Sequence, residues 1–352
     1  MDTIPVRPGE ELDGERLLPY LRQVLPDLPD GPLEVRQFPS GASNLTYLIR
    51  VGTFEAVLRR PPFGPVPPKA HDMRRESAFL ERLHPVFPLA PKPYWYCDDP
   101  GIIGAPFYLM ERRRGRVVDQ TFGPDLTPTP ALGAALSEAM VRILVAIHAV
   151  DWQAAGLGTF GHPEGFLGRQ VEGWVGRWER ARIAPLPETD TVVAWLRASV
   201  PTSPAPTVIH NDFKLNNVLW SLEDPTVPVA VLDWEMATIG DPLMDLGVSL
   251  TYWVEADDAD DLKAVLPTVT HQPGFYTRRE FVARYAELSG RDVSGFQFYE
   301  IFGYFKLAVV LQQIYARWYR GQTQDPRFAS FDRRVETLMR HAYALVRRAE
   351  GA

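Results

Sequence analysis

Residues 208–220, VIHNDFKLNNVLW, place a group of polar side chains between two apolar runs. The flanking runs are typical of buried segments, so we expect the polar residues between them to lie together at the edge of a core. Within this loop, His210, Asp212 and Asn217 fit the pattern H-x-D-x-x-x-x-N. This is the spacing of the catalytic loop in kinases.

The spacing of this loop has a chemical reason. Asp212 would accept or orient a substrate hydroxyl, and Asn217 would turn back to bind Mg2+ at the phosphates, since Mg2+ prefers oxygen ligands. Lys214 could neutralise the transferring phosphoryl group, although a solvated lysine is the alternative. Asp212 and Asn217 could also be ordinary turn or helix caps. We expect His210 to hold the loop by a hydrogen bond.

A second acidic residue follows at the distance that this chemistry needs. Asp233 comes sixteen residues after Asn217, at the end of the apolar run VAVLDW. In kinases, a metal-binding Asp takes this position after the catalytic loop. Caps alone would not predict Asp233, so the pattern favours a kinase-like site with Asn217 and Asp233 as the metal ligands.

Residues 208–220 and VLDWEMATIGDPLMDLG (231–247) together resemble the aminoglycoside phosphotransferase-like kinase family. The resemblance is strongest to the branch related to the kinase domains attached to some acyl-CoA dehydrogenases. Four further phrases carry it: PSGASNLTYLI, VLRRPP, AHDMRRE and FYLMERRRG. It covers roughly residues 30–330. It implies a protein-kinase-like fold and transfer of the γ-phosphate of ATP or GTP, with Mg2+, to a small-molecule hydroxyl.

The predicted elements agree with a β-rich segment followed by a helical one. Strands are predicted at 33–38, 45–51, 54–60 and 105–112, and helices at 14–26 and 71–84. Later helices are predicted at 131–150, 170–181, 192–199, 279–289, 299–319 and 331–349, with strands at 217–220 and 229–234. We therefore expect an α+β fold with two lobes. The predicted domains are a nucleotide-binding lobe (1–110), a hinge (111–116) and a helical lobe (117–352) that holds the catalytic loop and the acceptor site.

The turn PSGASN (39–44) lies where a kinase has its phosphate-binding loop. Gly41 would let the backbone approach a phosphate, Ser43 could donate its hydroxyl, and Ala42 and Asn44 complete the turn. The sequence lacks G-x-G-x-x-G, and an ordinary hairpin turn is the alternative.

A kinase also needs a cation on its third strand, paired with a glutamate of the following helix. Arg59 and Arg60 point to opposite faces of the predicted strand. The resemblance aligns Arg59 with the usual lysine and implies Glu76 as its partner. Glu81 is the weaker alternative. Arg supplies a permanent charge and a fork of donors to phosphate.

The resemblance implies further roles. Met110 would be the gatekeeper, and adenine would bind backbone groups near Glu111 and Arg113. Asp241 and Asp245 would brace the active-site loop, and His148 reads as a core histidine. Glu235 could reach a second metal or be a surface carboxylate.

The composition narrows the class of protein. The 352 residues carry a net charge of -7, which argues against a nucleic-acid partner. The single cysteine, Cys97, cannot form an internal disulfide. No secretory signal or apolar run of membrane-spanning length is apparent. We therefore expect a cytoplasmic protein with no membrane partner, while its oligomeric state stays open.

The sequence thus predicts an ATP- or GTP-dependent O-phosphotransferase whose acceptor is a hydroxylated acyl compound or another metabolite. An aminoglycoside phosphotransferase is the first alternative, because EADDADD (255–261) could attract a polycation. A nucleotide-binding pseudokinase that acts as a regulatory module is the second. Aromatic residues such as Trp253 and Tyr299 could line an acceptor pocket, although core packing is the better interpretation for most of them.

Overall fold

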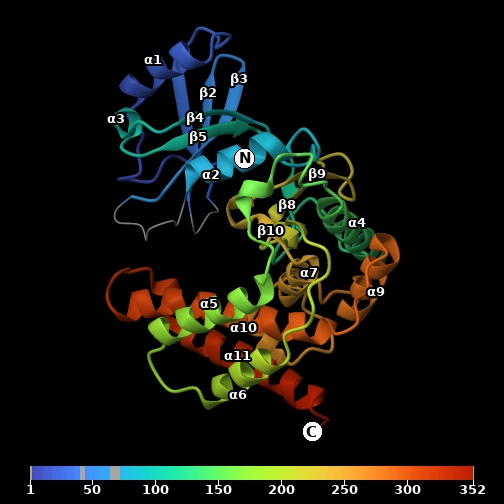
Figure 1. Ribbon diagram of the computed structural model, residues 1–352. Coiled ribbons are helices and arrows are strands. Elements are labelled where there is room, and N and C mark those ends of the chain that lie inside the picture. Colours follow the sequence, from blue (N-terminus) through green and yellow to red (C-terminus); the bar gives the residue numbers. More distant parts are fainter. Residues whose placement is uncertain (1, 40–43, 64–71, 352) are drawn as a thin grey trace. The chain divides into compact units, whose positions relative to one another are not determined.

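The computed structural model describes residues 2–39, 44–63 and 72–351, and the chain forms two compact units (Figure 1). The first unit comprises Met1–Gly115 and Val229–Glu235, and the second comprises Arg116–Pro228 and Met236–Ala352. Each unit is described by itself below.

An antiparallel sheet of five strands, in the order β1-β2-β3-β5-β4, forms the centre of the first unit. Its strands are β1 (Leu33–Gln37), β2 (Leu45–Val51), β3 (Phe54–Arg60), β4 (Pro93–Cys97) and β5 (Phe107–Glu111). Four of these strands confirm the prediction to within two residues. Strand β4 was not predicted, because it is a short run that begins at a proline and follows a proline-rich stretch.

The two faces of this sheet bury different kinds of residue. Leu58 of β3 belongs to an apolar cluster with Leu17 and Leu21 of helix α1 (Gly14–Val24). The opposite face carries Arg59, which pairs with Glu76 of helix α2 (Met73–Leu83). A short helix, α3, spans Pro100–Ile103. The alternation of side chains along β3 therefore directs Arg59 to the face that α2 covers.

Residues 229–235 return to the first unit after the chain has built much of the second. Strand β9 (Pro228–Val231) makes the crossing, and the Val231 N–H donates to the Leu89 carbonyl at 2.8 Å. Trp234 is buried against Phe79 of α2 and against Phe87. The sequence analysis placed all residues after 117 in one lobe; the structure differs because the indole of Trp234 packs into the core of the first unit.

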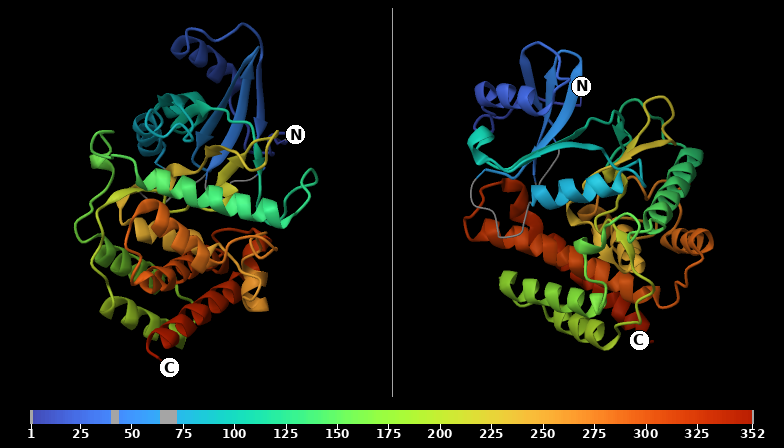
Figure 2. Two further views of the ribbon diagram at one scale, coloured as in Figure 1. Left: turned by 90° about the vertical axis from the view of Figure 1, so that its right-hand side faces the viewer. Right: turned by 45° about the horizontal axis from the view of Figure 1, so that its top comes forward.

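Helices dominate the second unit. They are α4 (Pro130–His148), α5 (Phe166–Ala181), α6 (Pro187–Ala198), α7 (Pro242–Thr251), α8 (Asp260–Val265), α9 (Arg278–Ser289), α10 (Phe296–Tyr319) and α11 (Phe331–Ala349). The long helix α10 packs against α5, α6, α7 and α11. Figures 1 and 2 show α10 and α11 side by side, and Figure 2 shows α5 and α6 running along this pair. The six helices predicted after residue 130 are confirmed with shifts at their ends.

Short strands hold the loops of this unit in place. Strand β6 (Arg116–Val117) pairs with β8 (Val218–Trp220), and β7 (Thr207–Ile209) pairs with β10 (Thr238–Gly240), both antiparallel. Single helical turns occur at Gly158–Phe160, Leu215–Asn217, Trp234–Met236 and Pro326–Ser330. The strands β7 and β8 enclose the polar loop with which the sequence analysis began.

Helix α4 is long and apolar enough to span a membrane by length and composition, although no such run was expected from the sequence. By length and composition it is the one helix in the described ranges that could span a membrane, with a mean hydropathy of 1.6. Half of the 18-residue segment of α4 that has this hydropathy is buried, and α4 packs against α9 and β7. Core helices of globular proteins meet the same criterion, so the feature is weak evidence for a membrane span.

Candidate active site

The loop after β7 brings the predicted catalytic residues together. The Lys214 ammonium donates to Oδ2 of Asp212 at 2.8 Å. The Asn217 amide nitrogen donates to the Asp212 carbonyl at 2.8 Å and to Oδ2 of Asp212 at 3.2 Å. The helical turn Leu215–Asn217 folds Asn217 back onto Asp212. Asp212, Lys214 and Asn217 therefore form one hydrogen-bonded group in the second unit.

The buried carboxylate of Asp245 holds the backbone of the loop that carries Asp212. Asp245 of α7 accepts the backbone N–H groups of His210 and Asn211, both at 2.6 Å, and its Oδ2 lies 3.2 Å from Nε2 of His148. Burial alone would raise the pKa of Asp245, but the contacts with His148 and His210 outweigh it and lower the pKa. Burial lowers the pKa of His148 against the pull of Asp245, and its Nδ1 lies 2.7 Å from the Tyr285 hydroxyl.

Asp241 caps the same helix. Its side chain accepts from the N–H of Leu243 at 2.8 Å, from the Ser203 hydroxyl at 2.8 Å and from the Tyr299 hydroxyl at 2.9 Å. Burial raises the pKa of Asp241, and these hydrogen bonds offset only part of the cost of removing its charge from water. Asp241 and Asp245 thus brace α7 and the loop, in the roles that the resemblance implied.

Lys306 of α10, which was not among the predicted site residues, supports the loop. Its ammonium donates to the backbone oxygen of Asn211 at 2.9 Å and to Oδ1 of Asn211 at 2.6 Å. Asn211 has φ +67°, a left-handed conformation that non-glycine residues seldom adopt. The signal in the sequence was a lysine within the apolar run IFGYFKLAVV, where burial of a charge is costly.

In the first unit, Arg59 binds three carboxylates. It donates through Nη1 to Oε1 of Glu76 at 2.9 Å, and through Nη2 to Oδ1 of Asp233 at 2.6 Å and to Oε2 of Glu235 at 3.4 Å. Asn44, the last residue of the predicted phosphate loop, donates to the same oxygen of Glu235 at 2.7 Å. The structure thus groups Arg59, Glu76 and Asp233 with two residues, Asn44 and Glu235, whose pairing the sequence analysis did not foresee.

The neighbouring candidates lie elsewhere. Arg60 points to the other face of β3 and donates to the Ile103 carbonyl at 2.8 Å. Glu81 is exposed on α2. Strand alternation and helix burial therefore select Arg59 and Glu76 within their own unit.

The buried charges of the Arg59 cluster shift the pKa values of one another. Burial alone would lower the pKa of Arg59, but Glu76 and Asp233 outweigh it and raise that pKa well above its usual value. Burial raises the pKa of Glu76 to about 7 in spite of Arg59. Asp233 has φ +68°, so a strained backbone directs its carboxylate. A second guanidinium, that of Arg75, donates to the backbone carbonyl of Glu235 at 3.3 Å.

The two residues predicted to bind Mg2+, Asn217 and Asp233, belong to different units. Asn217 uses its amide nitrogen on Asp212, so its side-chain oxygen is the atom suited to a cation. Asp233 contributes a carboxylate. Across residues 2–39, 44–63 and 72–351, no group of three or more His, Cys, Asp or Glu side chains forms a ready metal cage. Mg2+ in nucleotide enzymes is typically held by one or two protein ligands together with phosphates and water.

The remaining predicted nucleotide contacts fall partly outside the structure. Gly41, Ala42 and Ser43 lie outside the described residues. Met110 is buried on β5 opposite Val57 of β3.

The residues after Met110 make contacts of their own. The Glu111 N–H already donates to the Lys92 carbonyl at 2.7 Å, and Arg113 donates to the Pro88 carbonyl at 3.0 Å. The Glu111 N–H therefore already has a backbone partner.

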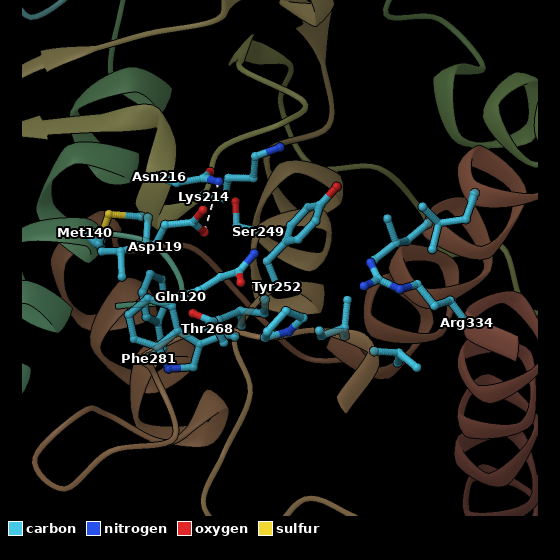
Figure 3. Close-up of a pocket in the computed structure, with 18 residues that line it drawn as sticks. Asp119, Gln120, Met140, Lys214, Asn216, Ser249, Tyr252, Thr268, Phe281 and Arg334 are labelled. Atoms are coloured by element: carbon cyan, nitrogen blue, oxygen red, sulfur yellow. Dashed lines mark hydrogen bonds between the residues drawn. The ribbon is translucent and has the colours of Figure 1, made fainter. Parts of the chain in front are cut away.

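A pocket of about 190 Å³ in the second unit adjoins the catalytic loop. Figure 3 shows Lys214, Asn216 and Asp119 at one side of it and Arg334 at the other. The Lys214 ammonium lies 4.8 Å from the centroid of the Tyr252 ring, and Asn216 donates to Asp119 at 3.2 Å. Much of the lining is apolar: Met140, Leu215, Leu250, Trp253, Val265, Leu266, Pro267, Phe281, Leu307 and Leu311. Trp253 thus lines the pocket, whereas Tyr299 belongs to the buried core.

Comparison with known sequences places the chain in a family. The model of the phosphotransferase enzyme family matches residues 34–281. Acyl-CoA dehydrogenase family member 10 of Mus musculus is 33% identical over 334 residues, which are 92% of this chain and 30% of that protein. Family member 11 of Rattus norvegicus is 32% identical over 92% of this chain and 42% of that protein. The chain therefore spans less than half the length of these relatives.

Solved structures share the fold. A crystal structure from Ralstonia eutropha, provisionally assigned as an aminoglycoside phosphotransferase, has a TM-score of 0.79 and 28% identity over 96% of this chain and 99% of that one. A choline kinase of Cryptosporidium parvum has a TM-score of 0.66 at 12% identity, covering 96% of each chain. The GDP and kanamycin complex of an aminoglycoside phosphotransferase has a TM-score of 0.61 at 15% identity, covering 93% of this chain and 98% of that one.

The α+β, protein-kinase-like fold is thereby confirmed, with a β-rich first unit and a mainly helical second one. The resemblance to the branch associated with acyl-CoA dehydrogenases is confirmed as well. On the match of its residues 34–281, this chain belongs to the phosphotransferase enzyme family.

Proposed function

We propose that the chain is a small-molecule kinase, which transfers the γ-phosphoryl group of ATP or GTP to a hydroxyl group. The observation that carries the proposal is the carboxylate of Asp212, which Lys214 and Asn217 hold from two directions on a loop clamped by Asp245. Family membership supports the same chemistry.

In the proposed reaction, Asp212 orients the acceptor hydroxyl and takes its proton. The hydroxyl oxygen forms a bond to the γ-phosphorus as the bond from that phosphorus to the β–γ bridging oxygen breaks, and the nucleoside diphosphate leaves. Lys214, 2.8 Å from Asp212, is placed to neutralise charge on the equatorial phosphoryl oxygens. Positioning and charge neutralisation supply most of the rate enhancement in such reactions.

Other residues would bind the nucleotide. Arg59, held by Glu76, would contact the α- and β-phosphates, and Asn44 with Gly41, Ala42 and Ser43 would cover them. Asn217 and Asp233 would each give an oxygen to the Mg2+ that accompanies the nucleotide, and this ion would neutralise phosphate charge when bound. Backbone groups near Glu111 and Arg113 would receive the base beside Met110.

We further propose that the acceptor is a hydroxylated acyl compound or a similar metabolite with an apolar body. The largely apolar pocket beside Lys214 and Asn216 supports this class, because apolar pockets with a few polar groups bind such ligands. Similarity to acyl-CoA dehydrogenase family members also supports it. A cytoplasmic location without nucleic-acid or membrane partners completes the proposal.

An aminoglycoside acceptor is the less favoured alternative. The acidic run 255–261 was the feature that suggested a polycation. Glu255 and Asp258 form ion pairs with Arg278 at 3.0 and 2.7 Å, so two of its carboxylates already have a cationic partner. The pocket lining carries one carboxylate, Asp119, and two cations, Lys214 and Arg334, which is not the acidic lining that would attract a polycation. A pseudokinase is disfavoured because Asp212, Asn217 and Asp233 are all present.

The test is a coupled assay of nucleoside diphosphate release with Mg-ATP or Mg-GTP and three acceptor panels: hydroxyacyl thioesters and hydroxy acids, aminoglycosides, and simple alcohols. We expect release that depends on the first panel and on Asp212. Turnover with aminoglycosides alone would support the alternative acceptor. A thermal shift by Mg-nucleotide without turnover on any panel would support the pseudokinase.

A further inference from the structure

Two elements of the second unit fix the residue that precedes Asp212. From α7, Asp245 accepts the N–H groups of His210 and Asn211, both at 2.6 Å. From α10, Lys306 donates to the backbone oxygen and to the side-chain oxygen of Asn211 at 2.9 and 2.6 Å. A carboxylate thus holds the donors of this turn and an ammonium holds its acceptors.

The Lys306 contacts restrict the conformation of Asn211 in particular. One ammonium binds two oxygens of the same residue, so it links the side-chain torsions of Asn211 to its backbone. That backbone is in the left-handed region at φ +67°, which costs free energy and persists only where surrounding contacts impose it. The next residue in the chain is Asp212, so its direction depends on how this turn is held.

Burial of the Lys306 ammonium on α10 costs free energy. The side chain of this lysine is 6% exposed on α10, between the buried residues Phe305 and Leu307. Burial lowers the pKa of Lys306 to about 8. The carboxylates of Asp212 and Asp245 raise this pKa, whereas the positive charges of Lys214 and of Arg177 on α5 lower it. The ring of Trp174, on α5, lies 5.6 Å from the ammonium. A methionine would fill the same space at no electrostatic cost, so the charge needs an explanation beyond packing.

We infer that Lys306 is a positioning residue for phosphoryl transfer, which acts through Asn211 to direct the carboxylate of Asp212 at the acceptor hydroxyl. This inference rests on the proposed function of Asp212. It assigns Lys306 no contact with substrate or nucleotide, and so it separates the effect of Lys306 on turnover from any effect on binding.

The test compares Lys306→Met, which keeps the volume, with Lys306→Arg, which keeps the charge. For Lys306→Met we expect kcat to fall about 10- to 100-fold, as misplacement of a catalytic group does, with the Kd for Mg-nucleotide unchanged and no fall in Tm. Lys306→Arg should recover part of kcat. The control is Lys92→Met at an exposed lysine of the first unit, which should leave kcat unchanged.

Hydrogen exchange provides a readout that does not require activity. Lys306→Met should accelerate exchange in peptides that cover residues 208–217 and leave those of α11 unchanged. Parental kcat in Lys306→Met would overturn the inference, as would a loss of kcat that merely follows a fall in Tm and is not recovered by Lys306→Arg. If the parent protein transfers phosphate to no acceptor, the proposed function fails, and unchanged exchange at 208–217 would then show separately that Lys306 does not position the loop.

Discussion

Nη2 of Arg59 lies 2.6 Å from Oδ1 of Asp233, although the two residues are 174 positions apart in the chain. The contact joins the third strand of the sheet to the segment that returns to the first unit after β9. Arg59 also binds Glu76 at 2.9 Å, so one buried guanidinium connects a strand, a helix and the proposed metal ligand.

The Arg59 cluster predicts a large and specific effect of substitution. Arg59→Met would leave Glu76 and Asp233 without their cation, and removal of one partner from a buried ion pair costs about 3–5 kcal/mol. We expect the free energy of unfolding to fall by about this amount in denaturant titrations. Arg59→Lys should lower the free energy of unfolding less, because lysine keeps the positive charge but lacks the two parallel N–H donors of the guanidinium. Arg16→Met, at an exposed arginine of α1, is the control, and an equal loss there would contradict this account.

Glu235 accepts hydrogen bonds from two residues proposed to bind phosphate, so we expect it to compete with the nucleotide for these donors. Its carboxylate accepts from Asn44 and Arg59, both proposed to bind the nucleotide. Glu235→Gln removes a negative charge beside them, so we expect the affinity for metal-free ATP to rise several-fold in calorimetric titrations. Glu223→Gln, at an exposed acid, should leave that affinity unchanged. Weaker metal-free binding in Glu235→Gln would instead indicate that Glu235 supports the donors rather than competing for them.

The pocket beside Lys214 predicts a variant that affects the acceptor alone. Val265 is a partly exposed residue at the end of α8 that lines the pocket, whereas its neighbour Ala264 is exposed and does not line it. The indole of Val265→Trp would displace part of the acceptor from the pocket. We expect the KM for the acceptor to rise about tenfold, because the loss of a few buried methylene contacts of a ligand has this size. Ala264→Trp should leave this KM unchanged. An unchanged acceptor KM in Val265→Trp would place the acceptor elsewhere.

Lys306 predicts opposite pH trends for turnover and stability. Its pKa in the folded protein is about 8, below the ordinary value of 10.5. Between these values the unfolded chain binds more protons at this residue, so the Lys306 contribution to the free energy of unfolding rises with pH. Turnover should fall over the same range, because the ammonium that holds Asn211 becomes neutral.

Rate profiles and denaturant titrations from pH 7 to 10 measure both trends. Lys306→Met should show neither. Parallel pH trends for turnover and stability in the parent protein, both retained in Lys306→Met, would exclude Lys306 as their source.

The sequence predicted those parts of the site that depend on local spacing or on alternation. Asp212 and Asn217 are five residues apart, and a single helical turn is enough to bring them together. Strand alternation places Arg59 and Arg60 on opposite faces, and the resemblance selected Arg59. The resemblance supplied Glu76, and the structure places it 2.9 Å from Arg59.

The parts that the sequence analysis missed depend on contacts between distant segments. Lys306 lies 95 residues from Asn211, and Glu235 lies 191 residues from Asn44, so no periodicity relates either pair. The strands β7 and β10 have three residues each, too few for an alternating pattern. Their pairing depends on tertiary packing, which composition and spacing do not encode.

The central claim is that Asp212 supports transfer of a phosphoryl group to a carbon-bound hydroxyl. The most direct measurement is phosphorus NMR of the products formed from Mg-ATP or Mg-GTP and the best acceptor of the three panels. We predict a new phosphate monoester resonance with the parent protein and none with Asp212→Asn, although Asp212→Asn still binds Mg-nucleotide. The same monoester formed at the parental rate by Asp212→Asn, or only inorganic phosphate formed by the parent, would contradict the account.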